Sequence, residues 1–218
     1  MAIVLFGSPG SGKGTQARLL TERLRIPHVS TGDMLRERIR TGVEMGGAAA
    51  KMQSGELVSD GVVNQMVEER LSQPDAVNGF ILDGYPRTVD QGAHLNTWLD
   101  ARGIAEVVIH LAVDYNNIIA RLTGRRVCPR CGTLYNLATK PPKVDGICDL
   151  DGERLVIRND DREDVIRHRL NAYDHQTRPV LEFYRGAGRR LLEVNASVDP
   201  PEIVFEKICQ AIDCHDRS

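Results

Sequence analysis

The sequence predicts an α/β fold in which helices flank a parallel β-sheet. Apolar segments alternate with helical patterns along most of the 218 residues, which is typical of parallel strands joined by crossover helices. The first segment, Ala2–Phe6, is an unbroken apolar run of the length of a buried strand. Two long segments, 30–59 and 124–161, break the alternation, and we expect them to be insertions in this fold.

Each expected element follows from an apolar run and its spacing. Runs of strand length lie at Ala2–Phe6, His28–Val29, Phe80–Leu82, Val107–Leu111 and Leu191–Val194. Helical spacing predicts helices at Lys13–Leu24, Asp33–Arg40, Asp60–Leu71, Val89–Ala101, Tyr115–Leu122, Arg162–Tyr184 and Glu202–Ile212. Segment 30–59 is short-helical and rich in Gly and Ala, whereas segment 124–161 contains Cys, Pro and Gly with almost no helical period.

A glycine-rich loop follows the first strand. Residues Gly7–Thr15 read G-S-P-G-S-G-K-G-T, and a helical pattern opens at Gly12. Such glycines let successive backbone N–H groups face one anion, the helix N-terminus adds partial positive charge, and Lys13 can reach the outer phosphates. Gly14 stands where Ser or Thr is usual, so Thr15 is the available hydroxyl for Mg²⁺. The alternative is a flexible glycine turn, but the preceding strand favours a P-loop.

A carboxylate ends the third expected strand. Asp83 directly follows Phe80–Leu82, at the edge of an open sheet where ligands bind. An acid at this place can hold the Mg²⁺ shell beside a phosphate loop, and the alternative is a carboxylate that only caps a turn. Arg87, in the following Gly84–Thr88, brings a guanidinium to the same edge and favours the Mg²⁺ role.

Composition narrows the class of partner. The net charge of −2 gives no sign of a nucleic-acid surface. Only five of the 28 basic residues are lysines, so an arginine is informative only at a motif position. No stretch approaches the roughly 20 apolar residues of a membrane span, and the first apolar run is too short for a signal peptide. We therefore expect a cytoplasmic protein with no nucleic-acid or membrane partner.

Cysteines in segment 124–161 form a metal-binding pattern. Cys128 and Cys131 make a C-x₂-C pair, Cys148 and Asp151 make a C-x₂-D pair, and sixteen residues separate the two pairs. Two tight turns of this kind supply the four corners of a structural Zn²⁺ site; a disulfide or free thiols are the alternatives. Cys209 and Cys214 lack partners at ligand spacing, and we expect Cys209 to be a buried small apolar residue.

Six motifs together resemble those of the adenylate kinase family, of the long type with a metal-bearing lid. They extend over roughly residues 1–185 in the family's order and spacing, and they are G-S-P-G-S-G-K-G-T (7–15), S-T-G-D-M-L-R (30–36), G-E-L-V-S-D (55–60), F-I-L-D-G-Y-P-R-T (80–88), G-R-R-V (124–127) and R-N-D-D-R-E-D (158–164). Lids of this type commonly carry four cysteines. Asp151 departs from that pattern, and its oxygen is a harder ligand than a thiolate.

The resemblance implies three parts of the chain. Residues 1–29, 60–123 and 162–218 would form the core P-loop domain. Residues 30–59 would clamp the nucleoside monophosphate, and residues 124–161 would form a zinc-bearing lid over ATP; we call these the clamp segment and the lid segment. The implied activity is reversible, Mg²⁺-dependent phosphoryl transfer from ATP to AMP, which gives two ADP, by a monomer.

The resemblance also implies the residues of the site. ATP would contact Gly10, Ser11, Gly12, Lys13, Gly14, Thr15, Arg125, Leu134 and Tyr135. AMP would contact Thr31, Arg36, Leu57, Val58, Ser59, Gly84, Tyr85, Pro86, Arg87, Gln91, Arg158 and Arg169. The catalytic set would be Lys13, Asp83, Arg87, Arg125, Arg158 and Arg169, because the transferring phosphoryl group spreads negative charge that these cations and Mg²⁺ neutralise.

Several of these positions have a structural alternative. Arg36 and Arg169 could lie on solvated helix faces, and Gln91 could be a surface amide. Arg125 competes with the adjacent Arg126 for its role, and Tyr135 could belong to the core of the lid segment.

Three other functions compete with phosphoryl transfer to AMP. A UMP/CMP kinase has the same scaffold, but those relatives tend to have Ala where this chain has Thr31, and they lack the long lid. A nucleotide-binding switch would not need the second phosphate site around Arg36 and Arg87. A zinc-ribbon nucleic-acid binder conflicts with the charge balance.

Overall fold

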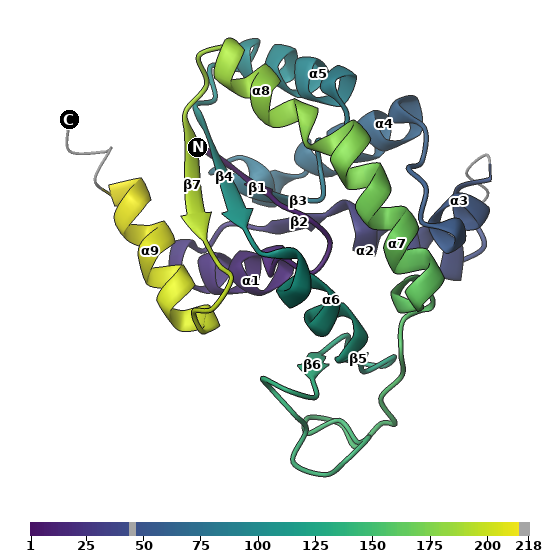
Figure 1. Ribbon diagram of the computed structural model, residues 1–218. Coiled ribbons are helices and arrows are strands. Elements are labelled where there is room, and N and C mark those ends of the chain that lie inside the picture. The colour runs from purple at the N-terminus through teal and green to yellow at the C-terminus, as the bar shows by residue number, and fades with distance from the viewer. Residues whose placement is uncertain (44–46, 214–218) are drawn as a thin grey trace.

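A five-stranded parallel sheet forms the centre of the molecule, which a computed structural model describes for residues 1–43 and 47–213 (Figure 1). The strand order is β2-β3-β1-β4-β7. Val4 in the middle strand pairs with Leu82 on one side and Val108 on the other. The strands are β1 (Ala2–Phe6), β2 (His28–Ser30), β3 (Phe80–Asp83), β4 (Glu106–Ala112) and β7 (Leu191–Asn195). The predicted α/β fold with a parallel sheet is confirmed.

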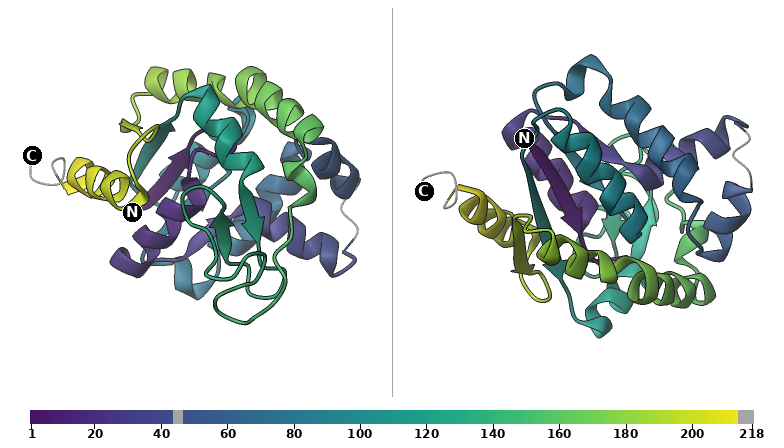
Figure 2. Two further views of the ribbon diagram at one scale, coloured as in Figure 1. Left: turned by 60° about the horizontal axis from the view of Figure 1, so that its bottom comes forward. Right: turned by 90° about the horizontal axis from the view of Figure 1, so that it is seen from above.

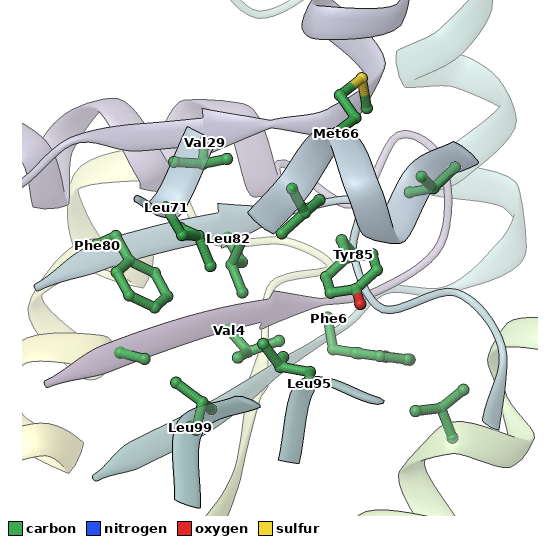
Figure 3. Packing of buried hydrophobic residues seen from close by; sticks show 14 of the residues in the cluster. Val4, Phe6, Val29, Met66, Leu71, Phe80, Leu82, Tyr85, Leu95 and Leu99 are labelled. Carbon is green, nitrogen blue, oxygen red and sulfur yellow. The ribbon is translucent and has the colours of Figure 1, made fainter. Parts of the chain in front are cut away.

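Helices cover both faces of the sheet, and the alternation of side chains along β1 divides the core between them. Val4 and Phe6 point into a cluster with residues of α4, α5 and α8 (Figure 3). Ile3 and Leu5 point into a second cluster with residues of α1 and α9. The flanking helices are α1 (Lys13–Leu24), α4 (Asp60–Leu71), α5 (Val89–Asp100), α6 (Tyr115–Thr123), α7 (Glu163–Ala172), α8 (Pro179–Gly186) and α9 (Pro201–Asp213).

The predicted helix over Arg162–Tyr184 is wrong as one regular helix. The α7 helix ends at Ala172, a π-helical turn occupies Tyr173–Thr177, and α8 begins at Pro179. Pro179 has no N–H to donate, which suits the first turn of α8 and not a helix interior. The two helices still run on from one another along the molecule (Figure 1).

The two insertions flank the carboxyl ends of the strands (Figure 2). The clamp segment carries α2 (Thr31–Arg40) and α3 (Ala48–Ser54). The lid segment carries a two-stranded antiparallel sheet of β5 (Arg125–Val127) and β6 (Leu134–Asn136). Short 3₁₀ turns at Pro74–Ala76 and Asn159–Asp161 complete the regular structure of the described chain. In the part of the chain that is described, no helix has the length and apolar content needed to cross a membrane.

Candidate active site

The carboxyl ends of β1, β2 and β3 open onto one large cavity. Its volume is about 920 Å³, and residues of the sheet edge, the clamp segment and the lid segment line it. It brings together most of the sequence-predicted site residues: Gly10, Ser11, Gly12, Lys13, Gly14, Thr15, Thr31, Arg36, Leu57, Val58, Asp83, Gly84, Pro86, Arg87, Gln91, Arg125, Leu134, Tyr135, Arg158 and Arg169. Ser59 and Tyr85 are not among its lining residues.

Glycines shape the loop after β1. Gly10 and Gly12 have φ values of 82° and 98°, in the left-handed region that favours glycine. A side chain at Gly10 would come within 2.9 Å of Leu122 Cγ in α6, so the loop passes too close to that helix for any larger residue. Gly12 directly precedes α1 and puts no side chain over the helix N-terminus. This end of the helix is therefore open to an anion.

Lys13 and Asp83 lie together beside this loop. Lys13 Nζ donates hydrogen bonds to the carbonyl oxygens of Gly7 and Ser8 at 2.8 and 2.9 Å. Burial lowers the pKa of Lys13 to about 8, and the charge of Asp83 opposes this shift. Burial raises the pKa of Asp83, but the contact with His28 Nε2 at 3.3 Å and the charge of Lys13 leave it below its ordinary value. The loop is thus flanked by an ionised carboxylate of the type that a Mg²⁺ shell uses.

The turn after β3 places Arg87. Gly84 has a φ of 80°, and a side chain there would come within 2.9 Å of both Arg87 Nη2 and Thr31 Oγ1. The Gly84 carbonyl accepts hydrogen bonds from Thr31 Oγ1 and Arg87 Nε, both at 2.8 Å. Burial, and next the charge of Arg169, lower the pKa of Arg87 to about 10, so its guanidinium remains charged at neutral pH.

Tyr85 and Ser59 lie differently from the other predicted contact residues. The Tyr85 side chain is buried in the core and donates a hydrogen bond to Asn64 Oδ1 at 2.8 Å (Figure 3). Only the backbone of Tyr85 can therefore face a ligand. Ser59 is an exposed residue at the N-terminus of α4.

Gln91 is buried in a polar network and is not a surface amide. Its side chain is 2% exposed and lines the cavity. Its Oε1 accepts a hydrogen bond from the Arg87 backbone N–H at 2.7 Å, and its Nε2 donates to Asp60 Oδ1 at 2.7 Å. Thr88 Oγ1 donates to the other oxygen of Asp60 at 2.8 Å and caps α5 by accepting from the Gln91 N–H.

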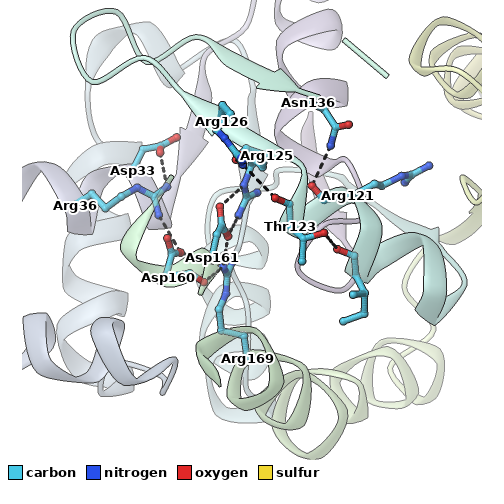
Figure 4. A network of polar contacts seen from close by, with 11 residues as sticks. Asp33, Arg36, Arg121, Thr123, Arg125, Arg126, Asn136, Asp160, Asp161 and Arg169 are labelled. Carbon is cyan, nitrogen blue, oxygen red and sulfur yellow. Dashed lines mark hydrogen bonds and ion pairs between the residues drawn. The ribbon is translucent and has the colours of Figure 1, made fainter. Parts of the chain in front are cut away.

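Two aspartates hold the arginines that come from three different segments (Figure 4). Arg125 donates to Asp161 through Nε at 2.7 Å and through a second bond from Nη2. Arg169 Nη1 lies 3.1 Å from a carboxylate oxygen of Asp160 and of Asp161. Arg36 pairs with Asp33 in its own helix and lies 3.8 Å from Asp160. The fully buried carboxylate of Asp161 thus joins the lid segment to α7.

The arginines of this cluster differ from their neighbours in the sequence in exposure and in hydrogen-bond partners. Arg169 has a side chain 18% exposed, whereas that of Arg167 is 74% exposed. Arg126 turns away from Asp161 and donates to the backbone carbonyls of Thr123 and Arg125. Burial, and next the charge of Arg36, lower the pKa of Arg158 to about 10.

Several cavity residues are not among those predicted. Asp160 lines the cavity, and the adjacent Asp161 pairs with Arg125 and Arg169. These acids lie two and three residues after Arg158, and the need to balance clustered arginines could have identified them. Arg121 also lines the cavity, and its guanidinium donates to the carbonyls of Ala196 and Ser197. Nothing in the local sequence distinguishes Arg121 from the many other arginines of the chain.

The four predicted metal ligands of the lid segment converge. One ligand atom from each of Cys128, Cys131, Cys148 and Asp151 lies within 4.8 Å of the others. Cys131 Sγ is 3.6 Å from Cys148 Sγ, and Cys128 Sγ is 3.3 Å from Asp151 Oδ2. Zinc–sulfur bonds of about 2.3 Å give tetrahedral S···S edges of about 3.8 Å, so the donor set fits a tetrahedral ion. Tyr135 packs in the same small core, where its hydroxyl accepts from the Asp149 N–H at 2.8 Å.

The other two cysteines lie apart from this cluster. Cys209 is half-buried on α9, not fully buried as predicted, and Cys214 lies outside the described residues.

Comparison with known proteins gives one consistent result. The family model described as "Adenylate kinase" matches residues 5–189. The chain is 47% identical over 207 residues to an adenylate kinase of Moorella thermoacetica, covering 94% of this chain and 95% of that protein. It is 45% identical over 210 residues to one of Oceanobacillus iheyensis (95% and 97%), and 46% identical over 216 residues to one of Chloroherpeton thalassium (98% and 96%).

Proposed function

The chain belongs to the adenylate kinase family, and from this membership we propose how its own residues carry the reaction. It is a phosphotransferase of the nucleoside monophosphate kinase class, and it moves a phosphoryl group reversibly from ATP to AMP to give two ADP. The proposal depends on a single observation: the phosphate loop and a second, arginine-lined region share one cavity. A protein that bound one nucleotide would need the loop alone.

In this proposal the loop holds ATP and the turn after β3 holds AMP. Gly10–Thr15 bind the phosphates of ATP, and Arg125, Leu134 and Tyr135 add contacts from the lid segment. AMP binds Thr31, Arg36, Arg87 and Gln91, with the backbone of Leu57–Ser59 and Gly84–Pro86. Arg158 and Arg169 contact the transferring phosphoryl group between the two nucleotides, which their place in the lining of the same cavity supports.

Catalysis is then positioning and charge neutralisation. An oxygen of the AMP phosphate attacks the γ-phosphorus, and the bond from that phosphorus to the β,γ-bridging oxygen breaks. No general base is needed, because a phosphate monoester with a second pKa of about 6 is ionised at neutral pH. Arginine suits this site because its planar fork binds phosphate oxygens in pairs and stays charged. Lys13 leaves its loop carbonyls to bind the phosphates.

Two metals belong to the proposal. The Thr15 hydroxyl and the Asp83 carboxylate would hold the shell of a Mg²⁺ ion bound with ATP, and that ion would neutralise phosphate charge. A structural Zn²⁺ on Cys128, Cys131, Cys148 and Asp151 would make the lid segment rigid. The contact distances among the four ligand atoms support this assignment.

We extend the proposal to the organisation of the chain. The core domain comprises 1–29, 60–123 and 162–218, and the clamp and lid segments close over the nucleotides to exclude water. The enzyme acts as a cytoplasmic monomer without nucleic-acid or membrane partners. The net charge of −2 supports the lack of a nucleic-acid surface. Sedimentation of the purified protein tests the monomer.

The decisive experiment follows ADP formation from MgATP with AMP, UMP, CMP or GMP as the acceptor, and with no acceptor. We expect rapid turnover with AMP and very slow ATP loss without an acceptor. Faster turnover with UMP or CMP would identify the alternative UMP/CMP kinase. Equal ATP loss with and without AMP would overturn phosphoryl transfer altogether.

A further inference from the structure

Asp60 connects the clamp segment to the turn that carries Arg87. It is the first residue of α4, directly after the clamp segment, and its two carboxylate oxygens accept from Gln91 Nε2 at 2.7 Å and from Thr88 Oγ1 at 2.8 Å. Both partners lie at the start of α5. Both oxygens of the Asp60 carboxylate therefore bind residues at the N-terminal end of α5.

The Gln91 amide is held at both ends and cannot reverse. Its oxygen accepts from the Arg87 N–H at 2.7 Å, and its nitrogen donates to Asp60. A reversed amide would set NH₂ against the Arg87 N–H and the carbonyl against the Asp60 carboxylate, which leaves two repulsive contacts in a side chain that is 2% exposed. One N–H and one lone pair of the amide remain for a ligand.

The cavity that Gln91 lines also has apolar walls that could hold a base. Leu35, Met52, Val58 and Val63, from the clamp segment and α4, are among the residues that line the same cavity. A base seated there has its polar edge matched mainly by the remaining amide groups of Gln91, so the order of donor and acceptor on this amide determines which base fits.

We propose that Asp60 is a positioning residue that fixes the order of donor and acceptor on Gln91 and so selects a 6-aminopurine over a 6-oxopurine monophosphate. The proposal rests on the proposed function, in which AMP occupies this part of the cavity. Adenine presents an acceptor at N1 and a donor at its 6-amino group. Hypoxanthine presents the reverse, a donor at N1 and an acceptor at O6, and it would require the reversed amide. Fixing the amide therefore rejects the 6-oxo base through unpaired polar groups.

The test compares kcat/KM for AMP and for inosine monophosphate in the same preparation, with saturating MgATP. The variant Asp60→Asn replaces one acceptor by a donor, which removes one of the two repulsive contacts of the reversed amide. We expect the AMP-to-IMP ratio to fall by about tenfold or more, mainly through a gain for IMP and a higher KM for AMP. Asp60→Ala, which removes both acceptors, should lower the ratio in the same direction. An unchanged ratio in both variants overturns the proposal.

Two controls separate this proposal from other effects. Asp90→Asn removes the same charge from an exposed first-turn residue of α5 and should leave the ratio unchanged. Gln91→Ala should raise KM for AMP, and an unchanged KM would mean that the proposed AMP site is wrong. A raised KM in Gln91→Ala, together with an unchanged AMP-to-IMP ratio in both Asp60 variants, would reject only the role of Asp60. Loss of folded protein lowers both rates equally, so the ratio still reports on the base even in a destabilised variant.

Discussion

At the scale of single residues, the site depends on partly or fully buried charged groups, each of which is paired with a specific residue of opposite charge. Asp161 is fully buried between Arg125 and Arg169, and Asp83 is half-buried near Lys13. The contact with His28 and the charge of Lys13 leave the pKa of Asp83 below its ordinary value, and Asp161 pairs with both of its arginines. The arrangement keeps the guanidinium groups oriented before any nucleotide arrives, so little reorganisation remains for the reaction.

Arg87 provides the sharpest test of this arrangement. Arg87→Ala removes a buried cation from the cavity, and we expect phosphoryl transfer to fall by two or more orders of magnitude, as for loss of a positioned transition-state contact of about 3 kcal/mol or more. Steady-state kinetics would measure the loss. Arg102→Ala, an exposed arginine stacked on Trp98 in α5, is the matched control and should keep normal turnover. Near-normal turnover of Arg87→Ala would remove it from the mechanism.

Glu106 makes the stability depend on pH. Its side chain is 1% exposed at the start of β4, and burial raises its pKa to about 7, while Arg189 at 3.4 Å opposes the shift. The folded chain therefore keeps a proton that the unfolded chain loses near pH 4.5. The free energy of unfolding should fall as pH rises from about 4.5 to about 7, by on the order of 3 kcal/mol.

Urea unfolding at pH 5 and pH 7.5 measures this contribution. The free energy of unfolding of Glu106→Gln should change less between these two pH values than that of the unchanged chain, because the amide does not titrate. Glu22→Gln, at an exposed position of α1, should match the unchanged chain at both values. An equal change in the free energy of unfolding between pH 5 and pH 7.5 for Glu106→Gln and the unchanged chain would mean that Glu106 is ionised in the folded state.

At the scale of elements, the lid segment has a core of only four buried side chains beside its four candidate metal ligands. The core residues are Cys128, Tyr135, Cys148 and Leu155. So small a core does not order a 38-residue segment without a further constraint, which a metal ion on the four ligands would supply. Asp151 adds a ready ligand, because the Glu153 N–H and then Cys148 lower its pKa to about 2.

Measurements of bound zinc and of hydrogen exchange in the lid segment test whether the four predicted ligands bind a metal ion. Asp151→Ala should lower zinc from one equivalent to well below one and increase hydrogen exchange across 124–161, while Asp151→Cys should keep the metal. Asp145→Ala, an exposed acid of the same segment, should behave like the unchanged chain. Full zinc occupancy in Asp151→Ala would show that the fourth ligand lies elsewhere.

The sequence predicted the elements that have a strong local signal and missed those that depend on distant contacts. The strands and most helices lie where apolar spacing placed them, because each run needs only its own pattern. The π-helical turn at Tyr173–Thr177 has no such pattern. The same holds for the site: Lys13 and Arg87 lie in motifs, whereas the Asp60–Gln91 contact joins residues 31 apart.

At the scale of the whole molecule, one cavity must accept two polyanions at once. A ligand that binds only the folded state at 100 times its Kd stabilises it by about 2.7 kcal/mol. We expect AMP and a non-hydrolysable ATP analogue to raise the thermal unfolding midpoint separately, and to raise it further when both are present. Calorimetry with each ligand alone and with both measures this. A combined shift no larger than the greater single shift would mean that the two ligands compete for one place.

The position of β1 has a consequence for the growing chain on the ribosome. The five residues Ala2–Phe6 occupy the middle of the sheet, yet their partners are residues 80–83 and 106–112. At about 5–20 residues per second, roughly 5 to 20 s of translation separate the first strand from its second neighbour. Until residues 80–83 are made, this apolar segment has neither neighbouring strand, and we expect a nascent-chain chaperone to bind it in that period.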